Sequence, residues 1–269
     1  MIALLAGRGR LPGLLFEALA GQGAAPLVCA LEGQPPEVPP GAEVLTYRIE
    51  TLGRLLDTLL ARGVRALCLC GGLSRPDIDP AAVDPATAPL LGRLRAAFDQ
   101  GDDGTLRALI AILEEAGFGI VGAHEIRPDL LLPEGVPTRA QPSRDAEQAA
   151  RFGLSEIAGL GARDAGQACI VAGGRIVGAE GPDGTDAMLR AAGSDARGAV
   201  LVKAPKPGQD RRADLPAIGP GTARAARAAG LAGVVIEAGG VLALDPGDTV
   251  AAFDEAGLFL WVRPPGAGP

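Results

Sequence analysis

Short apolar runs alternate with helical segments along the first half of the chain, and this alternation restricts the fold more than any other feature of the sequence. Leucines recur at helical spacing between the runs, as in residues 51–62 and 106–113. Strands that alternate with helices are expected to form a mostly parallel sheet with helices on both faces. The predicted strands are residues 2–6, 26–31, 65–70 and 118–122, and the predicted helices are residues 12–20, 51–62 and 106–113.

The second half predicts a separate α/β domain with a mixed sheet. Gly173-Gly174 lies between two strand-like runs as the turn of a hairpin. A stretch at 133–145 with three prolines among polar residues precedes this half and is the predicted linker. We therefore predict a Rossmann-like N-terminal domain over 1–132 and a second domain over 146–269. Its predicted elements are helices 145–158, 220–229 and 248–256, a further helix from Thr185, strands 168–172, 175–179, 199–203, 233–237, 241–244 and 258–262, and a frayed tail over 263–269.

Composition disfavours several classes of protein. The net charge is −7 and aromatic residues make up 3% of the chain, so a nucleic-acid binder is not expected. The first residues do not have the pattern of a signal peptide, so we expect no export, and the absence of a continuous apolar segment of about 20 residues predicts no transmembrane helix. We therefore expect a soluble cytoplasmic protein. Cys29, Cys68, Cys70 and Cys169 form no CxxC pair and accompany a single histidine, so we expect buried reduced thiols and no zinc site.

A glycine-rich turn follows the first predicted strand, at the edge of the sheet where ligands of open α/β sheets bind. Gly7 and Gly9, with Leu11 and Pro12, open the first predicted helix, and its N-terminus suits a phosphate or a nucleotide. Pro12 occupies the position of the third glycine in a dinucleotide-binding fingerprint, so that fingerprint is not met. A tight strand-to-helix turn is the alternative interpretation.

Two further strand ends in the first half carry polar side chains. Ser74 and Arg75 follow the strand at 65–70 and could hold phosphate or uracil oxygens, or could belong to a capped turn. His124 follows the strand at 118–122 and is either an acid or base or a structural histidine held by hydrogen bonds.

In the second half, Gly184-Thr185-Asp186 begins a predicted helix. Thr185 or Asp183 is a good N-cap, which would be a purely structural role. The functional alternative places the helix N-terminus and the Thr185 hydroxyl against a phosphate, with Asp186 able to approach a cation.

The most informative segment is 203–219, which places two lysines, two arginines and two aspartates within twelve positions after a predicted strand. Diphosphate hydrolysis needs this mixture, because Lys and Arg neutralise phosphate oxygens while carboxylates hold Mg²⁺. The metal or a carboxylate then orients and activates water. A solvated loop is the alternative, although three prolines would stiffen a mere linker to little purpose.

These motifs, in this order, resemble the LpxI family of UDP-2,3-diacylglucosamine pyrophosphatases over nearly the whole chain. Each motif is weak alone, whereas their order and the last block are specific. Two departures are Arg211-Arg212, where one arginine is expected, and the segment Glu180-Gly181-Pro182-Asp183. The matching segments are Leu5-Ala6-Gly7-x-Gly9-x-Leu11-Pro12, Gly72-Leu73-Ser74-Arg75-Pro76-Asp77, Gly101-Asp102-Asp103, Gly122-Ala123-His124-Glu125, Gly184-Thr185-Asp186-Ala187-Met188-Leu189 and Lys203-Ala204-Pro205-Lys206-Pro207-x-Gln209-Asp210-x-Arg212-x-Asp214-Leu215-Pro216-x-Ile218-Gly219.

The resemblance implies a Mg²⁺-dependent enzyme of two α/β domains, with substrate between them, that releases UMP and 2,3-diacylglucosamine 1-phosphate. It implies that Asp214 is the residue most needed for turnover, that water attacks the sugar-side phosphorus, and that the protein is a homodimer. Two acyl chains need an apolar cleft or a membrane-facing patch, so we expect transient contact with the inner membrane. The candidate segments are 89–98, 106–113 and Leu130-Leu131-Leu132, with ordinary core as the alternative.

We therefore predict that the C-terminal domain is catalytic and that Asp214 and Asp210 position Mg²⁺. A nucleotide- or NAD(P)-binding oxidoreductase and a non-catalytic nucleotide-sensing module remain as alternatives. The residues predicted to offset charge on the phosphate oxygens are Lys203, Lys206 and Arg212, and those predicted to bind substrate are Gly7, Gly9, Leu11, Pro12, Ser74, Arg75, His124, Thr185, Asp186 and Gln209.

Overall fold

The structure is a computed structural model that describes residues 1–98, 101–161 and 166–264. Two compact units are present, and each is described by itself. Unit 1 consists of Met1–Pro128 together with Arg212–Asp214, and unit 2 consists of Asp129–Arg211 and Leu215–Pro269. Both units are α/β, as the sequence predicts. The predicted domain limits differ from these divisions and stay a prediction.

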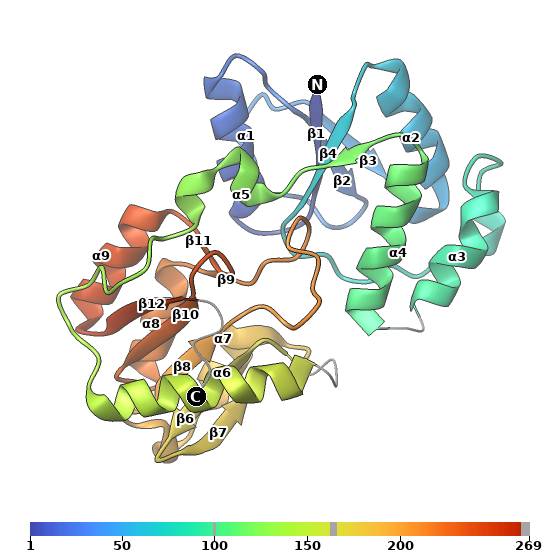
Figure 1. The fold of residues 1–269 in the computed structure, drawn as a ribbon. Coiled ribbons are helices and arrows are strands. Elements are labelled where there is room, and N and C mark those ends of the chain that lie inside the picture. Colours follow the sequence, from blue (N-terminus) through green and yellow to red (C-terminus); the bar gives the residue numbers. More distant parts are fainter. Residues whose placement is uncertain (99–100, 162–165, 265–269) are drawn as a thin grey trace. The chain divides into compact units, whose positions relative to one another are not determined.

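A five-stranded sheet forms the centre of unit 1 (Figure 1), in the order β3-β2-β1-β4-β5 with every pair parallel. All five residues of β2 are buried, as expected for a parallel strand covered on both faces. This confirms the predicted parallel sheet. The sequence analysis missed β3, an edge strand of four residues none of which is fully buried. The strands are β1 (Ile2–Ala6), β2 (Leu27–Leu31), β3 (Val44–Tyr47), β4 (Ala66–Cys70) and β5 (Gly119–Ile120).

Helices cover both faces of this sheet. On one face, α2 and α4 bury leucines such as Leu59 and Leu113 against Leu5 and Leu67 of the strands. On the other side of the sheet, α1 and α5 contact each other (Figure 1). The helix α4 begins at Gly101, five residues before the helical segment predicted at 106–113. The helices are α1 (Leu11–Gly21), α2 (Leu52–Ala61), α3 (Ala88–Phe98), α4 (Gly101–Glu115) and α5 (Ala123–Ile126).

Unit 2 is built on a second five-stranded sheet, in the order β12-β10-β8-β6-β7. The strands β8, β10 and β12 are parallel, whereas β6 is antiparallel to both of its neighbours, so the predicted mixed sheet is confirmed. A separate parallel pair joins two short strands, β9 and β11. The strands are β6 (Ala168–Ala172), β7 (Arg175–Ala179), β8 (Val200–Lys203), β9 (Ala217–Ile218), β10 (Gly233–Glu237), β11 (Leu242–Ala243) and β12 (Phe259–Arg263).

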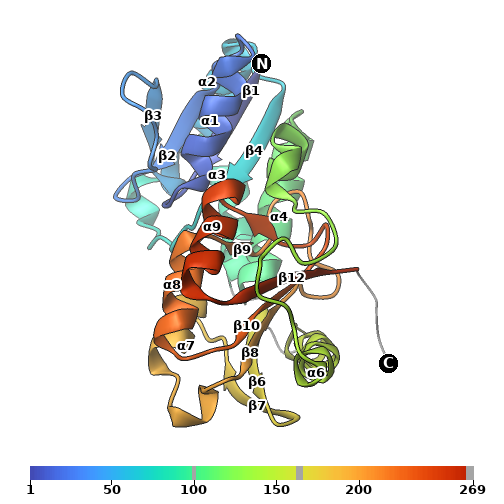
Figure 2. The same cartoon turned by 90° about the vertical axis from the view of Figure 1, so that its left-hand side faces the viewer.

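The helices of unit 2 lie on both faces of its sheet. Figure 2 shows α6 on one side and α7, α8 and α9 on the other. Alternation along the strands explains this, because Val202 packs in the cluster that holds Ala146 and Ala150 of α6, while Leu201 packs in the cluster that holds Leu189 of α7 and Ala223 of α8. The helices are α6 (Arg144–Gly161), α7 (Gly184–Ala191), α8 (Pro220–Ala228) and α9 (Pro246–Ala256).

The segment predicted as a linker packs along an edge of the unit 2 sheet. Gly135 forms an antiparallel bridge with Val262, and the Thr138 hydroxyl accepts a hydrogen bond of 2.9 Å from the backbone N–H of Leu260. These contacts cover the open side of β12. The predicted frayed tail is wrong at its start, because Arg263 ends β12 and is buried, and residues 265–269 lie outside the described part of the chain.

Buried apolar residues form a core in unit 1 and line both faces of the unit 2 sheet. All four cysteines are free and buried, as predicted, and a side-chain hydrogen bond with Cys68, together with burial, raises the pKa of the Cys70 thiol. In the leucine-rich segments considered for acyl chains, Leu94, Ile110 and Leu113 belong to the core of unit 1. Among the described residues, no helix has the length and apolar character needed to cross a membrane.

Candidate functional site

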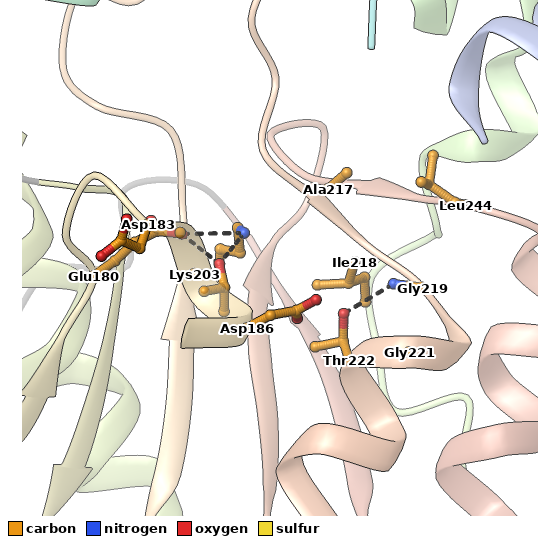
Figure 3. A pocket seen from close by; sticks show the side chains of 12 residues that line it. Glu180, Asp183, Asp186, Lys203, Ala217, Ile218, Gly219, Gly221, Thr222 and Leu244 are labelled. Atoms are coloured by element: carbon orange, nitrogen blue, oxygen red, sulfur yellow. Dashed lines mark hydrogen bonds and ion pairs between the residues drawn. The ribbon is translucent and has the colours of Figure 1, made fainter. Parts of the chain in front are cut away.

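A cavity of about 460 Å³ opens in unit 2 where the carboxyl end of β8 meets the first turns of α7 and α8 (Figure 3). Ligands of open α/β sheets bind at such strand ends. Its polar lining comes mainly from a lysine, three carboxylates and two threonines. The lining residues are Glu180, Asp183, Gly184, Thr185, Asp186, Lys203, Ala217, Ile218, Gly219, Gly221, Thr222 and Leu244.

Local sequence explains why these elements end at the cavity. The four residues of β8 are buried, and the strand stops at Lys203 because Pro205 follows soon after. The helix α8 begins with Pro220 directly after the extended Gly219, whose N–H donates a hydrogen bond of 3.1 Å to the Thr222 hydroxyl. This pairing fixes the first turn of α8 beside the cavity.

Lys203 lies at the carboxyl end of β8 with a side chain that is 8% exposed. Its Nζ donates a hydrogen bond of 2.6 Å to the Thr185 hydroxyl, which in turn donates to Oε1 of Glu180. Lys203 Nζ and Glu180 Oε1 are 3.8 Å apart, and the Glu180 side chain is 9% exposed. A buried ammonium therefore has a buried counter-ion with one hydroxyl between them.

The side chains at the start of α7 line the cavity and do not cap the helix. Asp183 is the N-cap residue, yet its side chain makes no capping hydrogen bond. The Thr185 hydroxyl is engaged by Lys203 and Glu180 instead. The structural alternative for this motif, a side-chain N-cap from Asp183 or Thr185, is thus not what the structure contains.

The electrostatics of the cavity are mixed. The N-termini of α7 and α8 each carry the equivalent of about half a positive charge, and Lys203 adds a full one. The carboxylates of Glu180, Asp183 and Asp186 oppose them, and Asp186 is exposed and reaches toward Thr222 in Figure 3. A cavity of this kind suits an anionic group accompanied by a cation.

Three of the predicted site residues, Lys203, Thr185 and Asp186, meet at this cavity. The other predicted residues of unit 2 belong to the loop after β8 and do not line it. Lys206 and Gln209 close a turn in which the Lys206 N–H donates to Oε1 of Gln209 at 2.9 Å and the Gln209 N–H donates to the Lys206 carbonyl at 3.2 Å. Gly208 has φ of +76° in this turn, a conformation that favours glycine.

The two predicted magnesium ligands fall in different units. Asp210 belongs to unit 2, whereas Asp214 belongs to unit 1 together with Arg212. Arg212 forms an ion pair of 2.8 Å with Glu114 of α4, also in unit 1. Among the described residues, no three His, Cys, Asp or Glu side chains form a group that could hold a metal ion. A joint metal site of Asp210 and Asp214 therefore stays a prediction.

In unit 1 the glycine-containing turn after β1 and the one after β4 are hydrogen-bonded to each other. The N–H of Arg8 donates to the Gly72 carbonyl at 2.8 Å and the N–H of Gly72 donates to the Arg8 carbonyl at 3.0 Å. A Cβ on Gly7 would lie 2.4 Å from the Gly72 carbonyl oxygen, so this glycine is needed for close packing. Gly9 differs, because its φ of +92° favours glycine while the space beside it is open.

Ser74 and Arg75, two further predicted residues of unit 1, have local hydrogen-bond partners. Ser74 accepts a hydrogen bond of 2.6 Å from Arg8, and Arg75 donates one of 2.8 Å to the Phe98 carbonyl. Leu11 and Pro12 form the start of α1. His124 is the second residue of the short α5, and its Nδ1 is buried without a hydrogen-bond partner within the described part of the chain.

Sequence reasoning did not select Glu180 and Thr222, although both line the cavity. A signal existed for Thr222, since Gly219-Pro220 followed by a threonine two residues later is typical of a helix start. Glu180 had no such signal. Its position depends on the antiparallel pairing of β6 with β7, after which its N–H donates to the Ala168 carbonyl.

Fold and cavity together define a two-unit α/β protein equipped to hold an anionic group. The comparisons with known proteins agree with this class. Residues 1–130 match the LpxI N-terminal domain and residues 133–261 match the LpxI C-terminal domain. The chain is 36% identical over 271 residues, with 96% of both chains covered, to a protein of Caulobacter vibrioides named UDP-2,3-diacylglucosamine pyrophosphatase LpxI. The chain belongs to the LpxI family, which confirms the resemblance found in the sequence.

Proposed function

We propose that this chain hydrolyses the diphosphate of UDP-2,3-diacylglucosamine in lipid A biosynthesis, releasing UMP and 2,3-diacylglucosamine 1-phosphate. Membership of the LpxI family and the name of the Caulobacter vibrioides relative support the substrate. The observation that carries the proposal is the cavity of unit 2, where Lys203 and the first turns of two helices converge. Ammonium groups and helix N-termini are the groups that proteins use to hold phosphates.

Within this proposal, the cavity binds one phosphate group of the substrate. Lys203 neutralises its oxygens, and the backbone N–H groups at the starts of α7 and α8 donate to it. Lys206 and Arg212 offset further negative charge, and Gln209 contributes an amide. The turns around Gly9 and Ser74 in unit 1 are assigned to the UMP half of the substrate, because strand ends of this kind accept nucleotides.

We further propose that Mg²⁺ is the cofactor. The donor chemistry fits, because Mg²⁺ takes oxygen ligands and is usually held by one or two carboxylates together with substrate phosphates. Asp214 and Asp210 would hold it. When bound, Mg²⁺ neutralises the diphosphate. Three carboxylates at the cavity support a need for it, since they would otherwise repel an anion.

In the proposed reaction, Asp214 orients a water molecule and accepts its proton. The water oxygen forms a bond to the sugar-side phosphorus, and the bond from this phosphorus to the bridging oxygen breaks. UMP leaves with the bridging oxygen, and the proton passes from Asp214 to solvent. Hydrolysis in oxygen-18 water should place the label in 2,3-diacylglucosamine 1-phosphate. Label in UMP would mean attack at the other phosphorus.

The deciding experiment measures UMP release from UDP-2,3-diacylglucosamine with Mg²⁺, with a chelator, and with the Asp214→Ala variant. Release should require both Mg²⁺ and Asp214. Asp57→Asn, which changes an exposed aspartate of α2, is the matched control and should match the wild type. Release at the wild-type rate from Asp214→Ala would remove Asp214 from the mechanism. No release by folded wild-type protein would favour the nucleotide-binding alternatives, which titration with UDP-sugars and NAD(P) would then test.

We also propose a cytoplasmic homodimer that touches the inner membrane transiently. The two acyl chains of the substrate support membrane contact, since burying each CH₂ is worth about 0.8 kcal/mol. Light scattering after size exclusion measures the oligomeric state, and a mass of one chain would contradict the dimer. Co-sedimentation with vesicles that contain the substrate tests contact, and equal recovery with and without vesicles would contradict it.

A further inference from the structure

Glu180 is fixed by backbone hydrogen bonds to both its main chain and its carboxylate. It follows β7, and its own N–H donates to the Ala168 carbonyl at 3.0 Å. Its Oε2 accepts a hydrogen bond of 2.8 Å from the N–H of Gln167. Gly166 has φ of +67° and lies so close that an added Cβ would be 2.4 Å from the Glu180 carbonyl oxygen. The carboxylate is therefore fixed by its surroundings before any ligand arrives.

The hydrogen bonds at this carboxylate have a defined direction. Lys203 has only donors, so the Thr185 oxygen must accept from it. The single hydrogen of that hydroxyl is then directed to Oε1 of Glu180. Thr185 is thus a hydrogen-bonded connection between two charged groups.

We propose that Glu180 is a positioning residue that acts through Thr185 to fix the Lys203 ammonium at the cavity. The inference rests on the proposed function, because it assigns to Lys203 the role of neutralising phosphate oxygens. It changes the role of Thr185, which the sequence analysis placed against the phosphate itself. Glu180 lines the cavity, and in this role its effect on turnover passes through Lys203.

A carboxylate is required at this position because both of its oxygens accept hydrogen bonds. Glutamine has the same shape but only one accepting oxygen. In Glu180→Gln, either Gln167 or Thr185 loses its acceptor. If Gln167 keeps its acceptor, the amide would donate to the Thr185 oxygen, and the hydroxyl hydrogen would turn toward Lys203. The Lys203 ammonium would then lose the hydrogen bond that fixes its position.

The kinetic test compares Glu180→Gln and Thr185→Val with wild type, with Glu255→Gln on the exposed side of α9 as the control. We expect kcat to fall roughly 10- to 100-fold in both variants, less than the roughly 100- to 1,000-fold for loss of a stabilising group itself, because Lys203 is still present. KM should stay the same in Thr185→Val, and it should stay the same or decrease in Glu180→Gln, because that variant removes a negative charge. Thr185→Ser, which keeps the hydroxyl, should recover most of the loss of Thr185→Val. Unchanged kcat in Glu180→Gln would overturn the proposal, as would a loss of kcat that Glu255→Gln shares.

A second test does not depend on turnover. Lys203 and Lys206 are the only lysines of the chain, so nitrogen-15 labelling of lysine gives two side-chain signals, which Lys206→Arg assigns. The Lys203 ammonium signal should persist in wild type and Glu255→Gln and should broaden in Glu180→Gln. Persistence of the signal in Glu180→Gln would overturn the positioning role even where the enzyme is active. A wild-type protein with this signal but no hydrolysis would instead contradict the proposed function.

Discussion

Arg212 donates a hydrogen bond of 2.8 Å from Nη1 to Oε1 of Glu114, a residue of α4. Within unit 1, the pair ties α4 to Arg212–Asp214, a stretch of three residues that the chain reaches only after β8. Ala213 packs against the apolar core of the same unit. Arg212 and Ala213 are therefore both anchored in unit 1 directly before Asp214. This gives Arg212 a structural role in addition to the proposed chemical one.

Substitutions of the two partners separate these roles of Arg212. Both side chains are about two-fifths exposed, so breaking the pair should change the free energy of unfolding by less than about 1 kcal/mol. If Arg212 neutralises phosphate oxygens, Arg212→Ala should lower kcat/KM at least roughly tenfold, while Glu114→Gln should retain most of the activity. Initial rates of UMP release measure both. An equal loss in the two variants would mean that Arg212 acts only by anchoring the loop.

Gly53 of α2 should tolerate no side chain. A Cβ at this position would lie 2.3 to 2.6 Å from backbone atoms of Ala86 and Thr87, and backbone atoms cannot move aside cheaply. We expect Gly53→Ala to lower the free energy of unfolding by about 2 kcal/mol or more. Gly92 of α3 is the control, because a Cβ there meets nothing within 4 Å.

Gly92→Ala should raise the free energy of unfolding by about 0.5 to 1 kcal/mol, since alanine is the better helix former. Urea denaturation followed by circular dichroism measures both variants. A stable Gly53→Ala protein would mean that α2 and the segment before α3 are packed less closely than the structure indicates.

Glu50 links unfolding of unit 1 to acid pH. Its side chain is 2% exposed and accepts hydrogen bonds from Arg48 and from the N–H of Asp79. The hydrogen bond with Arg48 is the main reason why the pKa of Glu50 is lowered to about 2, and the Asp79 N–H adds to it. Between pH 4.5 and 2 the unfolded chain binds a proton that the folded chain does not, so the free energy of unfolding falls as the pH falls.

The resulting contribution of Glu50 should be on the order of 1 to 3 kcal/mol above pH 4.5, reduced because Arg48 is half exposed. Glu50→Gln should remove it and flatten the dependence of unfolding on pH over this window. Glu17→Gln, at an exposed glutamate of α1, serves as the control. Denaturant titrations at pH 2.5, 4 and 6 measure the free energy of unfolding. If this free energy depended on pH equally in Glu50→Gln and in wild type, the assignment would be contradicted.

Much of the fold could be predicted because it is encoded locally. The buried parallel strands are continuous apolar runs, and helices such as α2 show clear periodicity. Elements that depend on distant partners could not be found. β3 is a short edge strand without a buried face, and β9 has two residues whose pairing with β11 is long-range. The helix α3 has only Leu94 and Ala97 buried, so its apolar stripe is too narrow to recognise.

The candidate site divides in the same way. Lys203, Thr185 and Asp186 were predictable because they stand at a strand end and a helix start, the places where phosphates bind. Glu180 was not, since its role depends on its approach to Thr185 and Lys203 in space. The separation of Asp210 from Asp214 was not predictable either, because four residues of a loop do not reveal which unit each end contacts.

Arg263 at the end of β12 gives the last prediction. It is 9% exposed, and its Nε and Nη1 are buried without hydrogen-bond partners among the described residues. The guanidinium lies 4.8 Å from the centre of the Trp261 ring, and desolvation followed by repulsion from Arg151 lowers its pKa. Leaving a buried charge without hydrogen bonds is costly, and apolar replacements of such groups are often neutral or stabilising.

Arg263→Met keeps the length of the side chain and should leave the free energy of unfolding unchanged or raise it by about 1 kcal/mol, because the lost contact with Trp261 offsets part of the gain. Arg151→Met, at an exposed residue of α6, should change it by less than about 0.5 kcal/mol. Thermal and urea unfolding measure both. A loss of more than about 2 kcal/mol in Arg263→Met would mean that the guanidinium has a bound anionic partner, since only a satisfied charge stabilises a fold to that extent.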